Sequence, residues 1–247
     1  MMKDWKKYLA EMLGTMILVL VGLGATFGAA AAGAGDFAYL VGALGFGLAL
    51  MAIIFIIGPI SGGHVNPAVS LGFALRKKLS WKDFCFYVVS QIIGAIVGVL
   101  LIFLMVKLNT LGHGDLKGMG SMFQKPGLPF VNSMFAALLL DVVMTFVFVL
   151  TIMGVVRKVE NKAVAAVALG LILLALVFTG AALNPAVALG SAIFGGVDVL
   201  KDVWLFILAP LVGGALAALV AHFLFKGEPK NEEKAKIAEP TSTSAKK

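Results

Sequence analysis

The sequence predicts an all-α membrane protein with six transmembrane helices plus two re-entrant half-helices, arranged as an inverted 3+3 repeat. Three observations lead to this fold class. The chain is 60% hydrophobic and only 13% charged, and its mean hydropathy of +1.01 is too high for a soluble domain of this length. Long apolar stretches divide it into candidate spans. One short segment also occurs twice, once in each half of the chain.

The candidate spans are apolar stretches with few internal charges, bounded by charged, Gly or Pro residues. In lipid such segments must be helical, because only a helix satisfies its own backbone donors and acceptors. The first follows a polar, basic start and is too long for the apolar part of a signal peptide, so we expect it to be retained. The spans are expected at 9–32, 39–58, 83–106, 132–156, 163–178 and 203–225.

Basic residues predict the orientation. They cluster before the first span, after the second, between the fourth and fifth, and after the sixth, and with six spans all four places fall on one side. We therefore expect a multi-pass protein of the cell membrane with both termini cytoplasmic. Residues 1–8 would be the cytoplasmic N-terminus, 107–131 an extracellular connecting loop, and 226–247 a disordered cytoplasmic tail.

The repeat consists of SGGHVNPAVSLGFAL at 61–75 and TGAALNPAVALGSAI at 179–193, which align without gaps. A second, weaker similarity between the halves is an acidic residue four positions before a threonine: Glu11 precedes Thr15, and Asp141 precedes Thr145. The chain is thus two halves, 9–106 and 132–225. Each holds three spans, an odd number, so the second half must enter the membrane from the opposite face.

Each copy of Asn-Pro-Ala is expected to begin a short helix, because Asn is a strong N-cap and Pro suits the first helical position. The apolar runs that follow are too short to span, so they predict half-helices at 66–76 and 184–194 that meet near the midplane and line a cavity. The motif residues are Asn66, Pro67, Ala68, Asn184, Pro185 and Ala186.

Such a junction discriminates by charge. Each half-helix directs about half a positive charge at the midplane, which repels cations that have lost their hydration. Asn66 and Asn184 would donate from their side-chain N–H groups to a passing water oxygen, which interrupts proton transfer along a chain of waters. Neutral molecules exchange hydrogen bonds at little net cost. The repeat therefore predicts a passive channel for water and other small neutral solutes that excludes ions and protons.

With its two NPA motifs at 61–69 and 179–187 and its acidic residues Glu11 and Asp141, the sequence resembles the aquaporin and glycerol facilitator family, the major intrinsic proteins, over residues 5–225. The resemblance implies a right-handed bundle that assembles as a homotetramer with one pore per subunit. The implied partners are therefore the lipid bilayer, water, small neutral solutes and further copies of the chain.

The resemblance also implies an outer constriction at four positions, Phe46, Ile172, Ala181 and Val187. Water-selective members carry His at the second of these and Arg at the fourth, so this chain departs from the family pattern. An apolar ring implies permeability to urea, ammonia or hydrogen peroxide as well as water. A shift of one turn in the fifth span would move the second position away from Ile172.

Four ionisable or reactive residues lie outside the constriction and the NPA motifs. Glu11 and Asp141 lie inside spans, where they either relay protons or, as we favour, accept hydrogen bonds from the re-entrant loops and support them. His64 is expected at the cytoplasmic mouth, either lining the pore or gating it with pH. Cys85, the single cysteine, is expected away from the pore.

The sequence carries no arrangement typical of an enzyme, a metal site or a bound cofactor. Its net charge of +7 resides in termini and short loops, which argues against a nucleic-acid partner. Three alternatives to a water-conducting channel remain. The first is a channel mainly for larger neutral solutes (glycerol, urea, ammonia or hydrogen peroxide) with slow water flux. The second is a secondary active transporter, and the third is a non-conducting junction protein.

Overall fold

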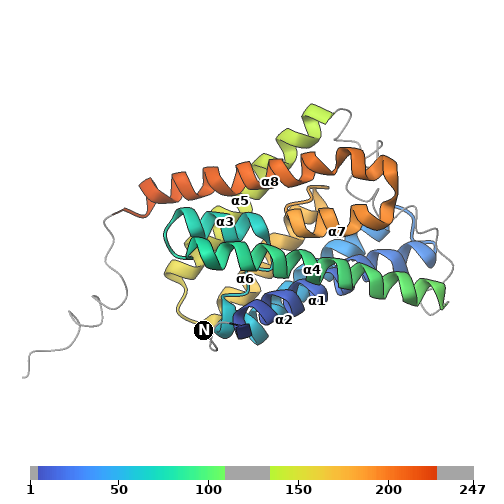
Figure 1. The fold of residues 1–247 in the computed structure, drawn as a ribbon, viewed down its shortest axis with the longest axis horizontal. Coiled ribbons are helices and arrows are strands. Elements are labelled where there is room, and N and C mark those ends of the chain that lie inside the picture. Colours follow the sequence, from blue (N-terminus) through green and yellow to red (C-terminus); the bar gives the residue numbers. More distant parts are fainter. Residues whose placement is uncertain (1–4, 109–133, 227–247) are drawn as a thin grey trace, which may run out of the picture.

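The structure is a computed structural model that describes residues 5–108 and 134–226, and these residues form eight helices (Figure 1). Two are short; of the other six, α4 and α8 run roughly along the long axis of the molecule, and α5 is steeply tilted to it. In chain order the helices are α1 (Trp5–Ala31), α2 (Phe37–Ser61), α3 (Pro67–Leu75), α4 (Trp81–Lys107), α5 (Met134–Lys158), α6 (Lys162–Phe178), α7 (Pro185–Gly195) and α8 (Val197–Leu224).

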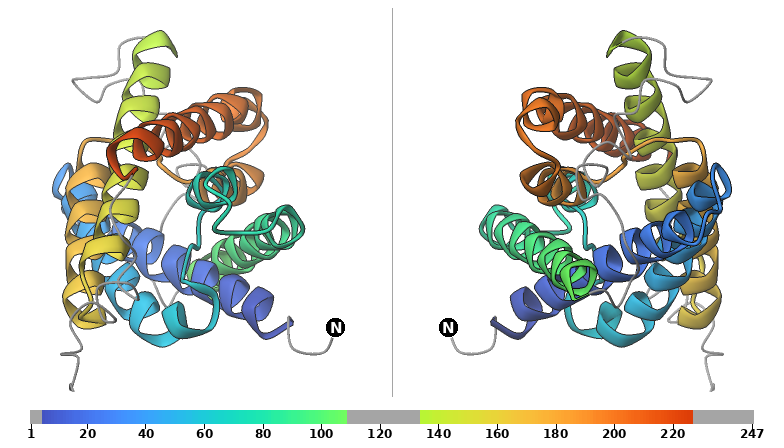
Figure 2. Two further views of the ribbon diagram at one scale, coloured as in Figure 1. Left: turned by 90° about the vertical axis from the view of Figure 1, so that its left-hand side faces the viewer. Right: turned by 90° about the vertical axis from the view of Figure 1, so that its right-hand side faces the viewer.

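The helices form two halves that pack in the same way. In the first half α1 packs on α2 and α4, and in the second α5 packs on α8 and, less closely, on α6. Each short helix contacts the last helix of its own half and that of the other half, since both α3 and α7 touch α4 and α8. Seen from the ends of the bundle, α3 and α7 lie one behind the other near its middle (Figure 2). This arrangement confirms the predicted fold class.

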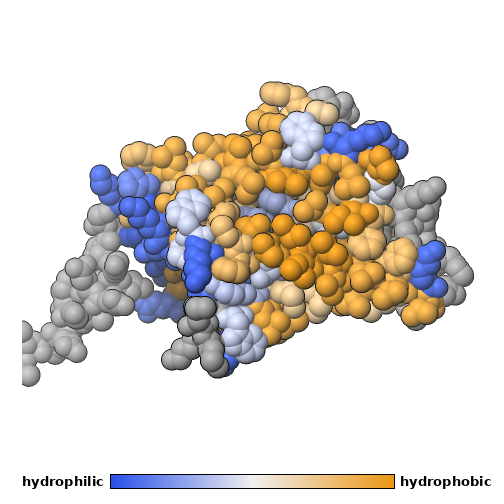
Figure 3. Space-filling view, viewed as in Figure 1, coloured by the Kyte–Doolittle hydropathy of each residue, from blue (hydrophilic) through white to orange (hydrophobic). Residues whose placement is uncertain are grey.

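Within the described residues, five helices are long and apolar enough to cross a membrane, namely α1, α2, α4, α5 and α8. The sixth candidate, α6, has 17 residues, and at about 1.5 Å per residue it reaches roughly 25 Å, the lower end of what a bilayer core requires. Apolar side chains cover the visible face between the two ends of the molecule, where hydrophilic residues gather (Figure 3). The protein is therefore a multi-pass membrane protein.

The observed helices extend beyond the hydropathy stretches. α1 begins at Trp5 and α8 at Val197, whereas the apolar runs predicted starts at 9 and 203. The added first turns are polar, as the ion pair between Asp198 and Lys201 illustrates. A hydropathy window misses such turns because they lie at the membrane surface, where a helix needs no apolar residues.

In each half, the helix that carries the buried acidic residue packs closely against the last helix of that half: α1 against α4, and α5 against α8. A Cβ atom on Gly94 of α4 would collide with the backbone oxygen of Met12, and one on Gly213 of α8 would lie 2.5 Å from that of Val142. Met12 directly follows Glu11, and Val142 directly follows Asp141. The two glycines are therefore equivalent positions of the repeat, which fixes the register between the halves.

α1 begins and α8 ends toward the left of Figure 1, and basic residues lie next to both of these helix ends in the sequence. The ammonium of Lys7 lies 2.9 Å from the carboxylate of Asp83 at the start of α4. The guanidinium of Arg157, at the end of α5, donates to the backbone oxygen of Phe225 over 3.1 Å. All these helix ends therefore share one side of the bundle, as the basic clusters predict.

Apart from residue 226, the tail at 226–247 lies outside the described residues, and so does the loop at 107–131 after its first two residues.

Candidate functional site

The site begins with two capped half-helices. Asn66 is the N-cap of α3, and its Oδ1 accepts a hydrogen bond of 2.8 Å from the backbone N–H of Ala68. Asn184 caps α7 in the same way, accepting from Ala186 over 3.1 Å. A proline stands at the first turn of each helix, where its missing N–H has no cost.

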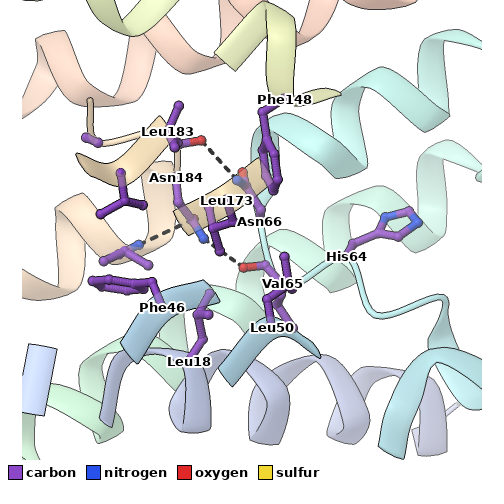
Figure 4. A pocket seen from close by; sticks show the side chains of 13 residues that line it. Leu18, Phe46, Leu50, His64, Val65, Asn66, Phe148, Leu173, Leu183 and Asn184 are labelled. Atoms are coloured by element: carbon purple, nitrogen blue, oxygen red, sulfur yellow. Dashed lines mark hydrogen bonds between the residues drawn. The ribbon is translucent and has the colours of Figure 1, made fainter. Parts of the chain in front are cut away.

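The residue before each asparagine has a left-handed backbone, with φ of 44° at Val65 and 61° at Leu183. This conformation is rare for residues with large side chains, and it persists only where surrounding contacts enforce it. The carbonyls of these two residues accept crosswise hydrogen bonds. Asn66 Nδ2 donates to Leu183 over 2.9 Å, and Asn184 Nδ2 donates to Val65 over 2.8 Å (Figure 4).

These bonds refine the expectation that the side-chain N–H groups point into the pore. An amide nitrogen carries two hydrogens, and each asparagine uses one to hold the opposite loop. One hydrogen on each nitrogen is left for a molecule in the pore. The crosswise pair thereby brings the two half-helices together through their N-terminal ends.

The first loop is held by the buried carboxylate of Glu11. It accepts backbone hydrogen bonds from His64 over 3.0 Å and from Val65 over 2.6 Å. Side chains add two more donors, the hydroxyl of Ser61 at 2.6 Å and the amide of Gln91 at 2.8 Å. A buried carboxylate with this many donors is satisfied without a counter-ion.

Sequence reasoning missed Gln91, a fully buried residue of α4. Its Nε2 donates both to Glu11 and, over 3.0 Å, to the hydroxyl of Ser70 on α3. Ser70 also lies 3.1 Å from the imidazole Nδ1 of His64. The signal was present in the sequence, because a lone amide inside an apolar span needs partners within the protein.

The second loop is held more sparsely. The carboxylate of Asp141 accepts from the backbone N–H of Leu183 over 2.8 Å, and its other oxygen, like the hydroxyl of Thr145, is buried without a partner among the described residues. The register set by the two glycines makes Pro210 the counterpart of Gln91. Proline has no side-chain donor, so the second half lacks the amide bridge of the first.

A narrow cavity surrounds the asparagine pair (Figure 4). The space open to the centre of a water molecule is about 20 Å³, which suffices for about one water. Apart from both asparagines and the ionisable His64, the described side chains that line it are apolar. Passage through this cavity is therefore single-file.

The cavity includes two of the four predicted constriction residues, Phe46 and Val187. From α6 it is lined by Leu173 and Val177, whereas Ile172 is half-buried and packs against the apolar core. From the second loop it is lined by Ala182, next to the predicted Ala181. Ile172 and Ala181 are not among its lining residues, and each is adjacent in sequence to one that is.

A wider vestibule of about 390 Å³, on the same measure, opens at the end of the bundle that carries Glu160 and Lys162. His64 lines both the vestibule and the central cavity, so it lies deeper than a residue at the mouth. Cys85 is exposed and lines neither space.

The electrostatic character of the centre comes from the backbone. The N-terminal ends of α3 and α7 both face it, and each carries about half a positive charge. Within residues 5–108 and 134–226, no group of three potential metal ligands occurs. The arrangement can bind and pass neutral hydrogen-bonding molecules while opposing cations.

Six spans, two half-helices and a narrow central cavity define a membrane channel. The family model of the major intrinsic proteins matches residues 1–221, so the chain belongs to the major intrinsic protein family. As a member of this family it is a passive channel and not an enzyme.

Two curated relatives cover most of the chain. It is 37% identical to aquaporin Z of Bradyrhizobium diazoefficiens over 230 residues, 90% of this chain and 94% of the relative. It is 36% identical to glycerol uptake facilitator protein-like 6 of Lactiplantibacillus plantarum, over 89% of this chain and 98% of that protein. Among solved structures, the aquaglyceroporin of Plasmodium falciparum shares the fold, with a TM-score of 0.70 over 90% of this chain and 97% of that one at 22% identity.

Proposed function

We propose that this channel conducts water and other small neutral solutes passively while excluding ions and protons. One observation carries the proposal: two asparagine-capped helix N-termini face each other across a cavity that holds about one water. Similarity to an aquaporin Z and to a glycerol uptake facilitator-like protein supports this substrate range.

The mechanism follows from the free hydrogen on each asparagine. A water at the centre accepts from Asn66 and Asn184, so its lone pairs are occupied and it cannot accept a proton from a neighbouring water. A cation meets two positive helix ends in an apolar cavity that cannot replace its hydration shell. Glu11 and Asp141 support the arrangement by fixing the loops that carry the asparagines.

Selectivity among neutral solutes is assigned to the outer ring of Phe46, Ile172, Ala181 and Val187. None of these side chains carries a charge or a hydrogen-bonding group, so a molecule in the ring gives up hydrogen bonds with water and gains few. Urea, ammonia and hydrogen peroxide are therefore proposed as further solutes. The second candidate function, a channel mainly for larger solutes with slow water flux, rests on the same apolar ring.

Placement in the cell is part of the proposal. The basic residues at the vestibule end favour a cytoplasmic location for that end and for both termini, in the cell membrane. We propose a homotetramer with a pore in each subunit and a cytoplasmic tail at 226–247.

The proposal is tested in proteoliposomes by stopped-flow light scattering under gradients of an impermeant osmolyte, urea and glycerol. Flux should rise linearly with the gradient, without saturation, and a pH-sensitive dye inside the vesicles should report no proton entry. Saturating flux coupled to protons would indicate a secondary active transporter instead. Water permeability equal to that of empty liposomes would refute the proposal.

A further inference from the structure

The boundary between the vestibule and the central cavity is formed by few side chains. Three residues from different elements line both spaces: Leu50 of α2, His64 of the first loop and Phe148 of α5. Side chains that face two adjoining spaces form the partition between them. They therefore surround the neck through which a solute passes from the wide vestibule to the single-file centre.

The geometry of the neck agrees with this role. In Figure 4 Phe148 lies above and Leu50 below the segment of Asn66, with His64 on the right. Leu50 and Phe148 are only 4% and 3% exposed, so surrounding atoms hold both side chains in place. The neck is thus a built part of the pore rather than a surface feature.

His64 is fixed in the neck by its own contacts. Its ring centroid lies 4.7 Å from that of Phe73 and 5.4 Å from that of Tyr87, and its Nδ1 is 3.1 Å from the Ser70 hydroxyl. A ring that is packed on two aromatic rings and hydrogen-bonded cannot swing aside for a larger solute at low cost.

The repeat shows what is particular about Phe148. It stands seven residues after Asp141, and Leu18 stands seven residues after Glu11, so the two are equivalent positions on α5 and α1. Leu18 lines only the central cavity, whereas Phe148 lines both spaces. Because the repeat is inverted, Leu18 faces the centre from the side opposite the vestibule, so the two sides of the centre carry side chains of different size at equivalent positions.

We propose that Phe148 is a further specificity-determining residue of this channel, because its ring limits the width of the neutral solutes that pass the neck readily. The inference deepens the proposed function and rests on it. It places the size filter on the vestibule side of the asparagines, in series with the outer ring. Solutes no wider than water pass, and wider ones such as urea and glycerol are retarded by the ring.

The test replaces the ring with the side chain of its counterpart, as Phe148→Leu. The ratio of urea to water permeability, measured by stopped-flow in proteoliposomes, should rise about tenfold, the scale on which pockets discriminate by a small change in side-chain volume. Water permeability should rise less, because water already fits. The matched control is Phe135→Leu on the lipid-exposed surface of the same helix, where Phe135 is 73% exposed; it should leave the ratio unchanged.

A second variant guards against a folding defect. In Leu18→Phe/Phe148→Leu the ring moves to the other half, where the inverted repeat places it at the centre on the side away from the vestibule. Its urea-to-water ratio should fall between those of the wild type and Phe148→Leu. The inference is overturned if the wild type conducts water and the ratio in Phe148→Leu equals that of the wild type. A wild type without water flux would instead overturn the proposed function.

Discussion

Asn66 and Asn184 each donate a side-chain hydrogen bond to the backbone carbonyl of the residue before the other. The two bonds, of 2.9 and 2.8 Å, relate the halves of the repeat through a pseudo-two-fold axis at the centre of the pore. The same side chains also cap their own helices through Oδ1. Each asparagine thus links its own helix to the opposite loop.

Removing one of these asparagines should lower the free energy of unfolding more than removing an ordinary helix cap does. We expect Asn184→Ala to destabilise the protein by about 2–4 kcal/mol, because it removes a cap and leaves the buried carbonyl of Val65 without its donor. The control is Asn161→Ala, which removes the exposed cap of α6 and should cost about 1 kcal/mol. Thermal unfolding in detergent measures both, and equal losses would contradict the structural role of the crosswise bond.

The two carboxylates should differ in importance. In Glu11→Gln a carboxylate that accepts four hydrogen bonds becomes an amide. The NH2 group of this amide cannot accept, so some of the four donors lose their partner. Asp141→Asn disturbs one hydrogen bond to the loop, the bond from the backbone N–H of Leu183. We expect Glu11→Gln to lower stability by about 1–3 kcal/mol more than Asp141→Asn, and to reduce water permeability more. A larger effect of the Asp141 variant would show that the donor counts do not govern loop stability.

The sparse support of the second loop can be improved. In Pro210→Gln the register places an amide opposite Asp141, where one carboxylate oxygen is buried without a partner among the described residues. We expect a gain of about 1 kcal/mol from the new hydrogen bond. Pro59→Gln, at the other intrahelical proline, controls for the removal of proline itself. The measurement is the unfolding temperature of both variants. A gain in Pro210→Gln no greater than that in Pro59→Gln would refute the proposed register.

The outer ring is tested by Val187→Arg. A long cationic donor in the ring should lower urea and glycerol permeability about tenfold relative to water. The ratio should be measured both in the wild type and in the Phe148→Leu background, where a widened neck makes the outer ring the narrower of the two. Unchanged ratios in both backgrounds would show that Val187 does not contribute to the filter.

Mercury compounds should inhibit this channel weakly, because the single thiol lies at the exposed start of α4 and lines neither cavity. Water permeability should fall by less than about a third at mercury concentrations that saturate an exposed thiol. Inhibition that is strong in the wild type and lost in Cys85→Ser would place the thiol at the pore.

Hydropathy and the repeat predicted the fold, because each follows from a simple physical requirement. Apolar stretches follow from the thickness of the bilayer, and the two Asn-Pro-Ala segments follow from the chemistry of helix starts. The first turns of α1 and α8 could not be predicted in this way, since they are polar and lie at the surface.

The site was harder to predict in detail. Ile172 was selected for the outer ring and stays a prediction, whereas Leu173 and Val177, which line the central cavity from the same helix, were not selected. The link between α6 and Asn184 has left-handed residues at Gly180 and Leu183, and sequence spacing does not determine a helix face across such a link. The repeat alone identifies Phe148 as the counterpart of Leu18, seven residues after Asp141. Its place between the vestibule and the central cavity is known only from the structure.

The crosswise asparagines also constrain how the chain is made. The donor on Asn66 and its acceptor on Leu183 are 117 residues apart, so at cellular synthesis rates the acceptor emerges roughly 6 to 23 s after the donor. During that interval the lone N-terminal end of α3 would face lipid with polar groups unmet, which the hydrocarbon does not tolerate. The first half-helix therefore reaches its final depth only when its counterpart arrives, and completion of the pore is a late event of biogenesis.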